Sequence, residues 1–147
     1  MNVRRGVVAV VYRTKESNIE FLLLHRTWIW KGWELLKGGI EKTADKGLDE
    51  LAVKREMEEE TGIRKIRIVT KMPHTIRYST PKKYEGKYPF KETVQSVFVV
   101  HALEDNVKIS LEHDSFMWLS YKDARKMLTH ANQKKALDEA WDFMKKE

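Results

Sequence analysis

The stretch R-E-M-E-E-E-T-G-I, from Arg55 to Ile63, decides the fold of this chain. Glu56, Glu59 and Glu60 are spaced i, i+3 and i+4, so a helix would place them on one side with Cβ atoms roughly 5–6 Å apart. Like charges at this spacing repel and destabilise an isolated helix. A solvated acidic stripe would account for the glutamates alone, whereas a site for a hard divalent cation would use their carboxylates as oxygen ligands. The flanking residues favour the metal site.

A glycine loop before this stretch completes a pattern that resembles the signature of the Nudix hydrolases. The loop is L-K-G-G-I-E, from Leu36 to Glu41, and its Gly38 takes the first position of that signature. From Gly38 to Ile63 the chain is three residues longer than the family pattern, and the loop acid of the signature, counted from either end, falls on a residue that is not acidic. Asp45 is the nearest acidic substitute. The second half of the signature is matched at every defined position, by Arg55, Glu56, Met57, Glu59, Glu60, Gly62 and Ile63.

The resemblance implies an α/β protein with the Nudix α/β/α sandwich around a central mixed sheet, and a single Nudix hydrolase domain over residues 1–147. It also implies a phosphoric anhydride hydrolase that depends on Mg²⁺ or Mn²⁺. Arg55 would orient the glutamates by ion pairing, and Glu56 would serve either as a metal ligand or as the general base. The metal ligands expected are Glu56, Glu59, Glu60 and Glu112, and the catalytic residues expected are Glu56, Glu59 and Arg55.

Two further segments are similar to those of the asymmetrical diadenosine tetraphosphate hydrolases within this family. They are W-E-L-L-K-G-G (33–39) and L-E-H-D-S-F-M-W-L (111–119). Leu36 stands where those enzymes carry proline, and Gly39 where they carry histidine. We expect hydrolysis of a nucleoside polyphosphate, with diadenosine tetraphosphate, cleaved to ATP and AMP, as the first candidate.

Two alternatives stay open. Within the enzyme class, the chain is an RNA 5′-pyrophosphohydrolase or a hydrolase of another nucleoside diphosphate derivative, and a basic loop at 82–91 suits an RNA 5′ end. Outside it, the chain is a catalytically silent module that binds a nucleotide or RNA. The complete acidic pattern argues against the silent module, because crowded carboxylates near a phosphate are unfavourable unless a metal lies between them.

Several residues outside the acidic stretch are candidates for contact with the substrate. A lysine in the glycine loop would meet a phosphate as a mobile point charge. Stacking of a base on an aromatic ring contributes about 1–3 kcal/mol, and residues 112–116 are expected to form one loop that presents a carboxylate to the metal and a ring to the base. Packing against the sheet, or exposure to solvent, is the plainer interpretation for each. These candidates are Lys37, Tyr84, Tyr88, Phe116 and His113.

Composition narrows the class of protein further. The chain has 147 residues, a usual length for one domain, with 41% hydrophobic residues and a mean hydropathy of −0.59. Its net charge of +6 suits an anionic partner. The absence of cysteine excludes disulfides and thiolate catalysis. No apolar run approaches the ~20 residues of a membrane helix, and no signal-peptide pattern is present at the start. We therefore expect a cytoplasmic protein, monomeric or a small homo-oligomer, without a membrane partner.

The pattern of apolar residues predicts the order of elements. A helix is expected from about Leu48 to Thr61, with Gly62 as its stop. Ser120-x-x-Asp123 predicts a second, short helix, and apolar residues at helical spacing predict a final helix near the C-terminus. Strands are expected at 7–12, 19–24, 66–70, 75–78 and 93–103. The residues expected to face the core from the first helix are Leu48, Leu51, Ala52 and Met57.

Overall fold

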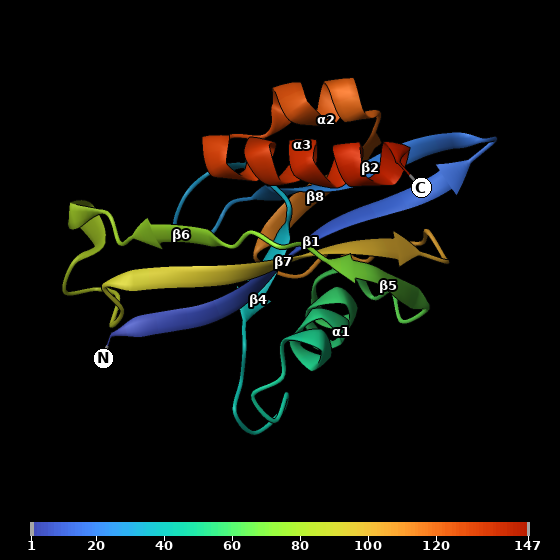
Figure 1. Cartoon of the computed structure of the whole chain (residues 1–147). Coiled ribbons are helices and arrows are strands. Elements are labelled where there is room, and N and C mark those ends of the chain that lie inside the picture. The colour runs from blue at the N-terminus through green and yellow to red at the C-terminus, as the bar shows by residue number, and fades with distance from the viewer. Residues whose placement is uncertain (1, 147) are drawn as a thin grey trace.

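The computed structural model describes residues 2–146, which form an eight-stranded mixed sheet with helices on both faces (Figure 1). α1 covers one face, and α2 and α3 cover the other, so the expected α/β/α sandwich is confirmed. The strands are β1 (Val3–Lys15), β2 (Asn18–Arg26), β3 (Gly32–Glu34), β4 (Leu36–Gly39), β5 (Ile66–Lys71), β6 (Ile76–Ser79), β7 (Glu92–Ala102) and β8 (His113–Leu119). The helices are α1 (Asp49–Thr61), the 3-10 helix η1 (Lys82–Tyr84), α2 (Tyr121–Met127) and α3 (Ala131–Lys145).

β1 is the central strand and brings the glycine loop to the site. It pairs in parallel with β7 along one edge, and antiparallel with β2 and β4 along the other. β7 also pairs with β5 and β6, and β2 also pairs with β3 and β8, all in antiparallel orientation. The pairing of Gly6 with Gly39 and of Val7 with Gly38 holds β4 beside the middle of the sheet, directly before the chain enters α1.

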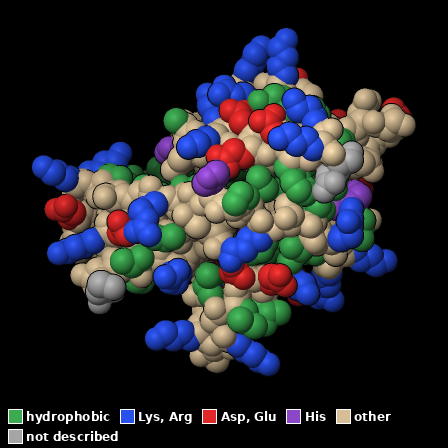
Figure 2. Space-filling view, viewed as in Figure 1, with side chains coloured by type: hydrophobic (Ala, Val, Ile, Leu, Met, Phe, Trp, Pro, Cys, Tyr) green, Lys and Arg blue, Asp and Glu red, His purple; other side chains and the backbone are tan. Residues whose placement is uncertain are grey.

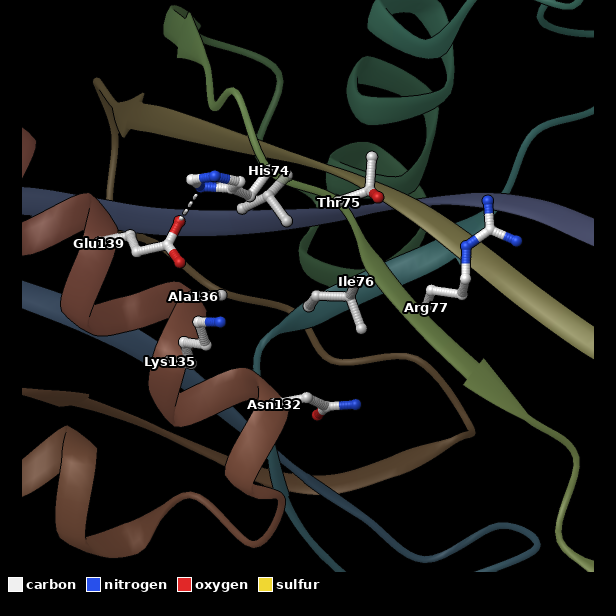
Figure 3. A pocket seen from close by; sticks show the side chains of 9 residues that line it. His74, Thr75, Ile76, Arg77, Asn132, Lys135, Ala136 and Glu139 are labelled. Carbon is white, nitrogen blue, oxygen red and sulfur yellow. Dashed lines mark hydrogen bonds and ion pairs between the residues drawn. The ribbon is translucent and has the colours of Figure 1, made fainter.

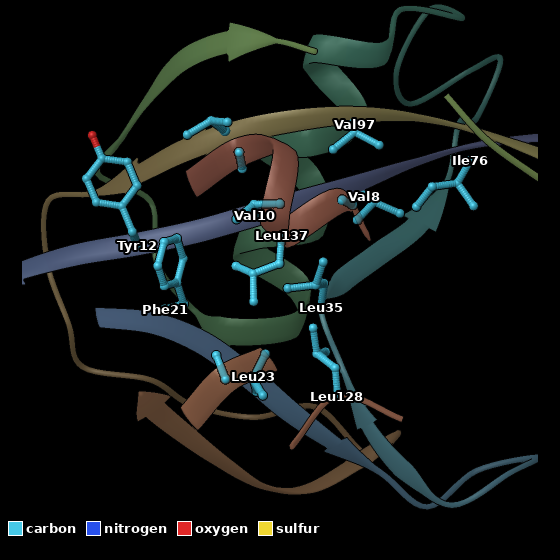
Figure 4. Packing of buried hydrophobic residues seen from close by; sticks show 14 residues of the cluster. Val8, Val10, Tyr12, Phe21, Leu23, Leu35, Ile76, Val97, Leu128 and Leu137 are labelled. Carbon is cyan, nitrogen blue, oxygen red and sulfur yellow. The ribbon is translucent and has the colours of Figure 1, made fainter. Parts of the chain in front are cut away.

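Alternation along β1 divides the core into two layers. Successive side chains of a strand point to opposite faces of the sheet, so Val8 and Val10 pack toward α2 and α3, whereas Val7 and Ala9 pack toward α1. Figure 4 shows the first layer, in which Leu137 of α3 lies over the strands. Helices therefore cover both faces in the middle of the sheet, and the charged site lies at the margin of the α1 layer.

α1 agrees with its prediction at both ends. Asp49 and Glu50 lie in its first turn, where the helix dipole favours negative charge. Gly62 adopts a left-handed φ of 74°, and its N–H donates to the carbonyl of Glu58 at 2.8 Å. The prediction for Leu48 is wrong, because this residue precedes the helix and is 56% exposed.

Outside α1, the structure confirms one predicted element and corrects another. The short helix after Ser120 is confirmed, and the Ser120 hydroxyl accepts a hydrogen bond from the N–H of Asp123 at 3.2 Å. The single loop expected at 112–116 is wrong, because His113 begins strand β8. Pairing of β8 with β2 outweighs the weak strand signal of the polar residues there. Among residues 2–146, no helix is both long enough and apolar enough to cross a membrane.

Candidate active site

The acidic face of α1 lies against the glycine loop of β4. The side chains of Glu56 and Glu60 are each only 10% exposed, whereas that of Glu59 is 54% exposed. A Cβ added to Gly38 would overlap the carboxylate of Glu56, so a side chain at this position would displace that carboxylate from its present place. The glycine at the first position of the signature, Gly38, thus leaves room for the carboxylate of Glu56.

Arg55 ties this acidic face to the loop. Its Nη1 donates to Oε1 of Glu56 at 2.7 Å and to Oε1 of Glu59 at 3.0 Å. Its Nη2 donates to the carbonyl of Gly39 at 2.7 Å. Its Nε and Nη2 form a two-point pair with Asp45 at 2.8 and 2.9 Å, which fixes the plane of the guanidinium. Arg55 thus contacts two of the glutamates and the loop, and its orienting role in catalysis stays a prediction.

Asp45 lies at the point where the sequence pattern is lengthened. Its side chain is 1% exposed, and the pKa of its carboxyl is held below the usual value chiefly by the Arg55 guanidinium. Its Oδ2 also accepts a hydrogen bond from the N–H of Glu41 at 2.8 Å. The turn closes through the N–H of Leu48, which donates to the carbonyl of Asp45 at 2.8 Å. The additional residues are accommodated in this turn, which still delivers an acid to Arg55.

Glu56 has an unusual protonation equilibrium. Burial raises the pKa of its carboxyl to about 7, with a further rise from the Glu60 and Glu59 carboxylates and an opposing effect of Arg55. A bound divalent cation would favour the charged carboxylate. Near neutral pH this carboxyl is therefore able both to exchange a proton and to respond to a metal.

His113 connects the acidic face to a second buried carboxylate. Its Nε2 lies 2.8 Å from Oε2 of Glu34, and its Nδ1 lies 3.1 Å from Oε2 of Glu60. Burial alone would lower the pKa of His113, but hydrogen bonds and attraction from the two carboxylates outweigh it and raise the pKa to about 9. Ser110 also donates to Oε2 of Glu60 at 2.8 Å. Glu60 is therefore held from two sides.

Glu34 in turn forms ion pairs with two cationic side chains, those of Arg26 and Lys37. Its carboxylate lies 3.1 Å from Nη1 of Arg26 and 3.5 Å from Nζ of Lys37. Burial would raise the pKa of Glu34, but His113, Lys37 and Arg26 together lower it. The pKa of Lys37 is lowered because burial disfavours its ammonium group, which Glu34 partly opposes. Two cations thus lie beside the acidic face, joined to it through Glu34 and His113.

Of the remaining predicted residues, Glu112 contacts the cluster, whereas Tyr84 and Tyr88 lie outside it. Oε2 of Glu112 is 3.6 Å from Nη1 of Arg26, and its side chain is 41% exposed. Phe116 is 37% exposed. It pairs with Leu24, whose side chain faces the α1 layer, so Phe116 points to the same side of the sheet. Tyr84 and Tyr88 lie in the hairpin loop between β6 and β7.

Sequence reasoning missed Glu34, Arg26 and Ser110. Glu34 was the one acid in an otherwise aromatic and apolar run, three residues before Lys37, and that isolated charge was the available signal. Neither Arg26 nor Ser110 stands in a pattern that marks it.

The acidic residues do not converge on one point as they stand. Within residues 2–146, no three histidine or acidic side chains are gathered closely enough to form a metal site. Glu56 and Glu59 point to Arg55, and Glu60 points to Ser110 and His113. The donor chemistry nonetheless fits a hard divalent cation, because three carboxylates share one helix face and the crowding raises the pKa of one of them.

A separate hollow lies on the opposite face, between β6 and α3 (Figure 3). His74 and Glu139 approach each other across it, with Nδ1 3.3 Å from Oε2, and Ile76 and Ala136 line its floor. It contains none of the predicted site residues.

An α/β/α sandwich whose helix carries Arg-Glu-x-x-Glu-Glu against a glycine loop defines the class of Nudix hydrolases. The family model of the NUDIX domain matches residues 2–140, and the chain belongs to this family. Enzymes of the family generally use divalent metal ions. The chain is accordingly a Nudix hydrolase, as the sequence predicted.

The similar proteins and solved structures are named for two kinds of substrate. The chain is 31% identical to an RNA pyrophosphohydrolase of a Sulfurovum species, over 89% of this chain and 86% of the relative. It is 32% identical to an RNA pyrophosphohydrolase of a Nitratiruptor species, over 82% and 79%. The structure is similar to a binary complex of the C. elegans Ap4A hydrolase, with a TM-score of 0.79 and 25% identity over 98% of this chain and 99% of that one.

Proposed function

We propose that the chain removes pyrophosphate from the triphosphorylated 5′ end of RNA, with Mg²⁺ or Mn²⁺ as cofactor. One observation carries the proposal: the carboxylate face of Glu56, Glu59 and Glu60 is joined, through His113 and Glu34, to the cations of Lys37 and Arg26. Hydrolysis of a polyphosphate asks a protein mainly for positioning and charge stabilisation. Carboxylates for a metal and cations for phosphate oxygens stand side by side here.

Each group has a role in this proposal. Glu56, Glu59 and Glu60 would hold the metal, with Glu112 as a further ligand, and the metal would neutralise phosphate charge and activate water. Arg55 orients Glu56 and Glu59, and Lys37 contacts the polyphosphate. Glu56, whose pKa is raised to about 7, is also suited to accept a proton at neutral pH.

The names of the curated relatives support RNA as the substrate. Two of them, each more than 30% identical to this chain over most of both lengths, are RNA pyrophosphohydrolases. The net charge of +6 also favours a polyanion.

A second candidate substrate is diadenosine tetraphosphate, cleaved to ATP and AMP. The likeness to the C. elegans Ap4A hydrolase supports it. So does the exposed ring of Phe116, which lies on the α1 side of the sheet and is open to a base. Both substrates present a polyphosphate to the same carboxylates and differ in what is attached beyond it.

A substrate panel distinguishes the two. The purified protein would be incubated with Mg²⁺ and 5′-triphosphate RNA, diadenosine tetraphosphate, ATP or a nucleotide sugar, and the products identified by chromatography. The first proposal is supported if 5′-triphosphate RNA has the highest kcat/KM and yields pyrophosphate and 5′-monophosphate RNA. The second is supported if diadenosine tetraphosphate has the highest kcat/KM and yields ATP and AMP. No product from any substrate would contradict both.

A further inference from the structure

We infer that the hairpin loop at residues 80–91 binds the single-stranded RNA chain beyond its 5′ end. This inference rests on the proposed function and extends it from the reacting phosphates to the rest of the substrate. Four observations support the inference: the loop has a conformation fixed by hydrogen bonds, it is positively charged, it is rich in aromatic residues, and it contacts the glycine loop of the site through Arg4.

The loop is ordered by its own hydrogen bonds. The N–H of Thr80 donates to the carbonyl of Lys91 at 2.9 Å, and the Thr80 hydroxyl donates to the carbonyl of Phe90 at 2.6 Å. Within the loop, the carbonyl of Tyr84 accepts hydrogen bonds from the N–H groups of Lys87 and Tyr88, each at 3.1 Å. A surface that is already ordered loses little conformational entropy when it binds.

The loop carries a clear excess of positive charge. It contains four exposed lysines and one glutamate, Glu85, so its net charge is +3. At the left end of the view in Figure 2, where Figure 1 shows this hairpin, lysine and arginine side chains outnumber acidic ones. None of the loop lysines forms an ion pair within residues 2–146. The four are Lys82, Lys83, Lys87 and Lys91.

Aromatic rings alternate with these lysines. Tyr84, Tyr88 and Phe90 are half-buried, with Tyr88 and Phe90 edge to face at 5.6 Å between ring centres. Nζ of Lys83 lies 5.1 Å from the ring of Tyr84. Lysines that meet phosphates and rings that stack on bases are the combination by which proteins bind single strands.

The loop is attached to the active site through Arg4. Nη1 of Arg4 donates to the hydroxyl of Tyr88 at 2.9 Å. The same guanidinium lies against Gly39, where a Cβ would come within 2.9 Å of Nη2. The carbonyl of Gly39 accepts a hydrogen bond from Arg55. Arg4 thus links the hairpin loop to the glycine loop, and on this inference an RNA chain whose 5′ phosphates lie at the acidic face runs past Arg4 to the hairpin loop.

The test compares short and long RNA in a charge variant. Single-strand binding surfaces cover about 4–16 nucleotides, so the substrates are a 5′-triphosphate dinucleotide and an oligonucleotide of about 10 nucleotides. The variant is Lys82→Gln/Lys83→Gln/Lys87→Gln. Its matched control is Lys122→Gln/Lys126→Gln/Lys135→Gln, which removes as many exposed lysines from α2 and α3, on the sheet face opposite α1. Melting temperatures verify that both variants are folded.

We expect wild type and control to hydrolyse the long RNA with a kcat/KM at least tenfold above that of the dinucleotide, and the loop variant to lose this advantage. Each lost phosphate contact should also reduce the salt slope of log Kd for a 5′-hydroxyl oligonucleotide by about 0.7. Equal length dependence in loop variant and wild type, or equal affinity for the 5′-hydroxyl RNA, would overturn the inference. Absence of pyrophosphate release from every RNA, with loop-dependent binding of the 5′-hydroxyl RNA intact, would instead overturn the proposed function alone.

Discussion

Nδ1 of His113 lies 3.1 Å from Oε2 of Glu60, so a residue of β8 fixes the last glutamate of the acidic face on α1. The other ring nitrogen meets Glu34, 79 residues away in the sequence. A buried imidazole between two carboxylates neutralises charge that would otherwise oppose folding.

His113→Ala should therefore destabilise the protein strongly. Removing one partner of a buried charge pair costs about 3–5 kcal/mol, because it leaves the other charge uncompensated. Urea unfolding monitored by circular dichroism measures this change in free energy. The matched control is His74→Ala, whose 75% exposed side chain pairs with Glu139 and should cost no more than about 1 kcal/mol. Equal losses of unfolding free energy in the two variants would show that the contacts of His113 with Glu34 and Glu60 stabilise the fold no more than an exposed ion pair does.

Stability without metal should fall as pH rises from about 5 to 9. The pKa of Glu56 rises from 4.5 to about 7 on folding, and that of His113 from 6.5 to about 9. Both groups bind protons more tightly in the folded state, so their contribution is complete at low pH and is lost as pH passes the folded pKa. Melting temperatures in EDTA measure this trend. In Glu56→Gln the part of the decline between about pH 5 and 7 should disappear; an unchanged pH profile in that variant would contradict the assignment.

Glu59→Gln should lower turnover by at least ~10²-fold, which corresponds to about 2.7 kcal/mol on the activation barrier. The amide keeps the size of the side chain but removes a charged metal ligand. Glu58→Gln is the control, because Glu58 is similarly exposed (52% against 54%) but pairs with Arg64. Initial rates at saturating Mg²⁺ compare the two. Near-wild-type turnover of Glu59→Gln would remove this residue from the site.

Phe116→Ala should weaken binding of diadenosine tetraphosphate by about 1–3 kcal/mol if its ring stacks on adenine. Because Phe116 is 37% exposed, the substitution should cost less stability than removal of a core ring. Met117→Ala is a matched control: Met117 is 40% exposed, and its neighbour Leu23 faces the α2 and α3 layer. Calorimetric binding to the catalytically impaired Glu59→Gln background measures both. Equal affinities in the two variants would exclude stacking on Phe116.

The acidic face could be predicted from the sequence because it is local. The spacing of Glu56, Glu59 and Glu60 sets one helix side, and Gly62 marks its end, without any knowledge of the rest of the chain. The contact of Glu34 with His113 could not be predicted, because it depends on β3 and β8 both pairing with β2.

Asp45 and β8 show two other limits of local reasoning. Counting positions leaves Asp45 outside the family pattern, and only the folded turn at 41–48 shows that it reaches Arg55. The start of β8 is polar, at Asp114 and Ser115, and therefore lacks the apolar alternation that marks a half-buried strand. Long-range pairing supplies what the local pattern does not.

The most direct test of the proposed function is the release of pyrophosphate from 5′-triphosphate RNA by the purified protein, measured with Mg²⁺, with Mn²⁺ and with EDTA. We predict pyrophosphate and 5′-monophosphate RNA with either metal, no release in EDTA, and at least ~10²-fold slower release by Glu59→Gln. Release that persists in EDTA, or the same rate in wild type and Glu59→Gln, would contradict a metal-dependent hydrolysis on the acidic face of α1.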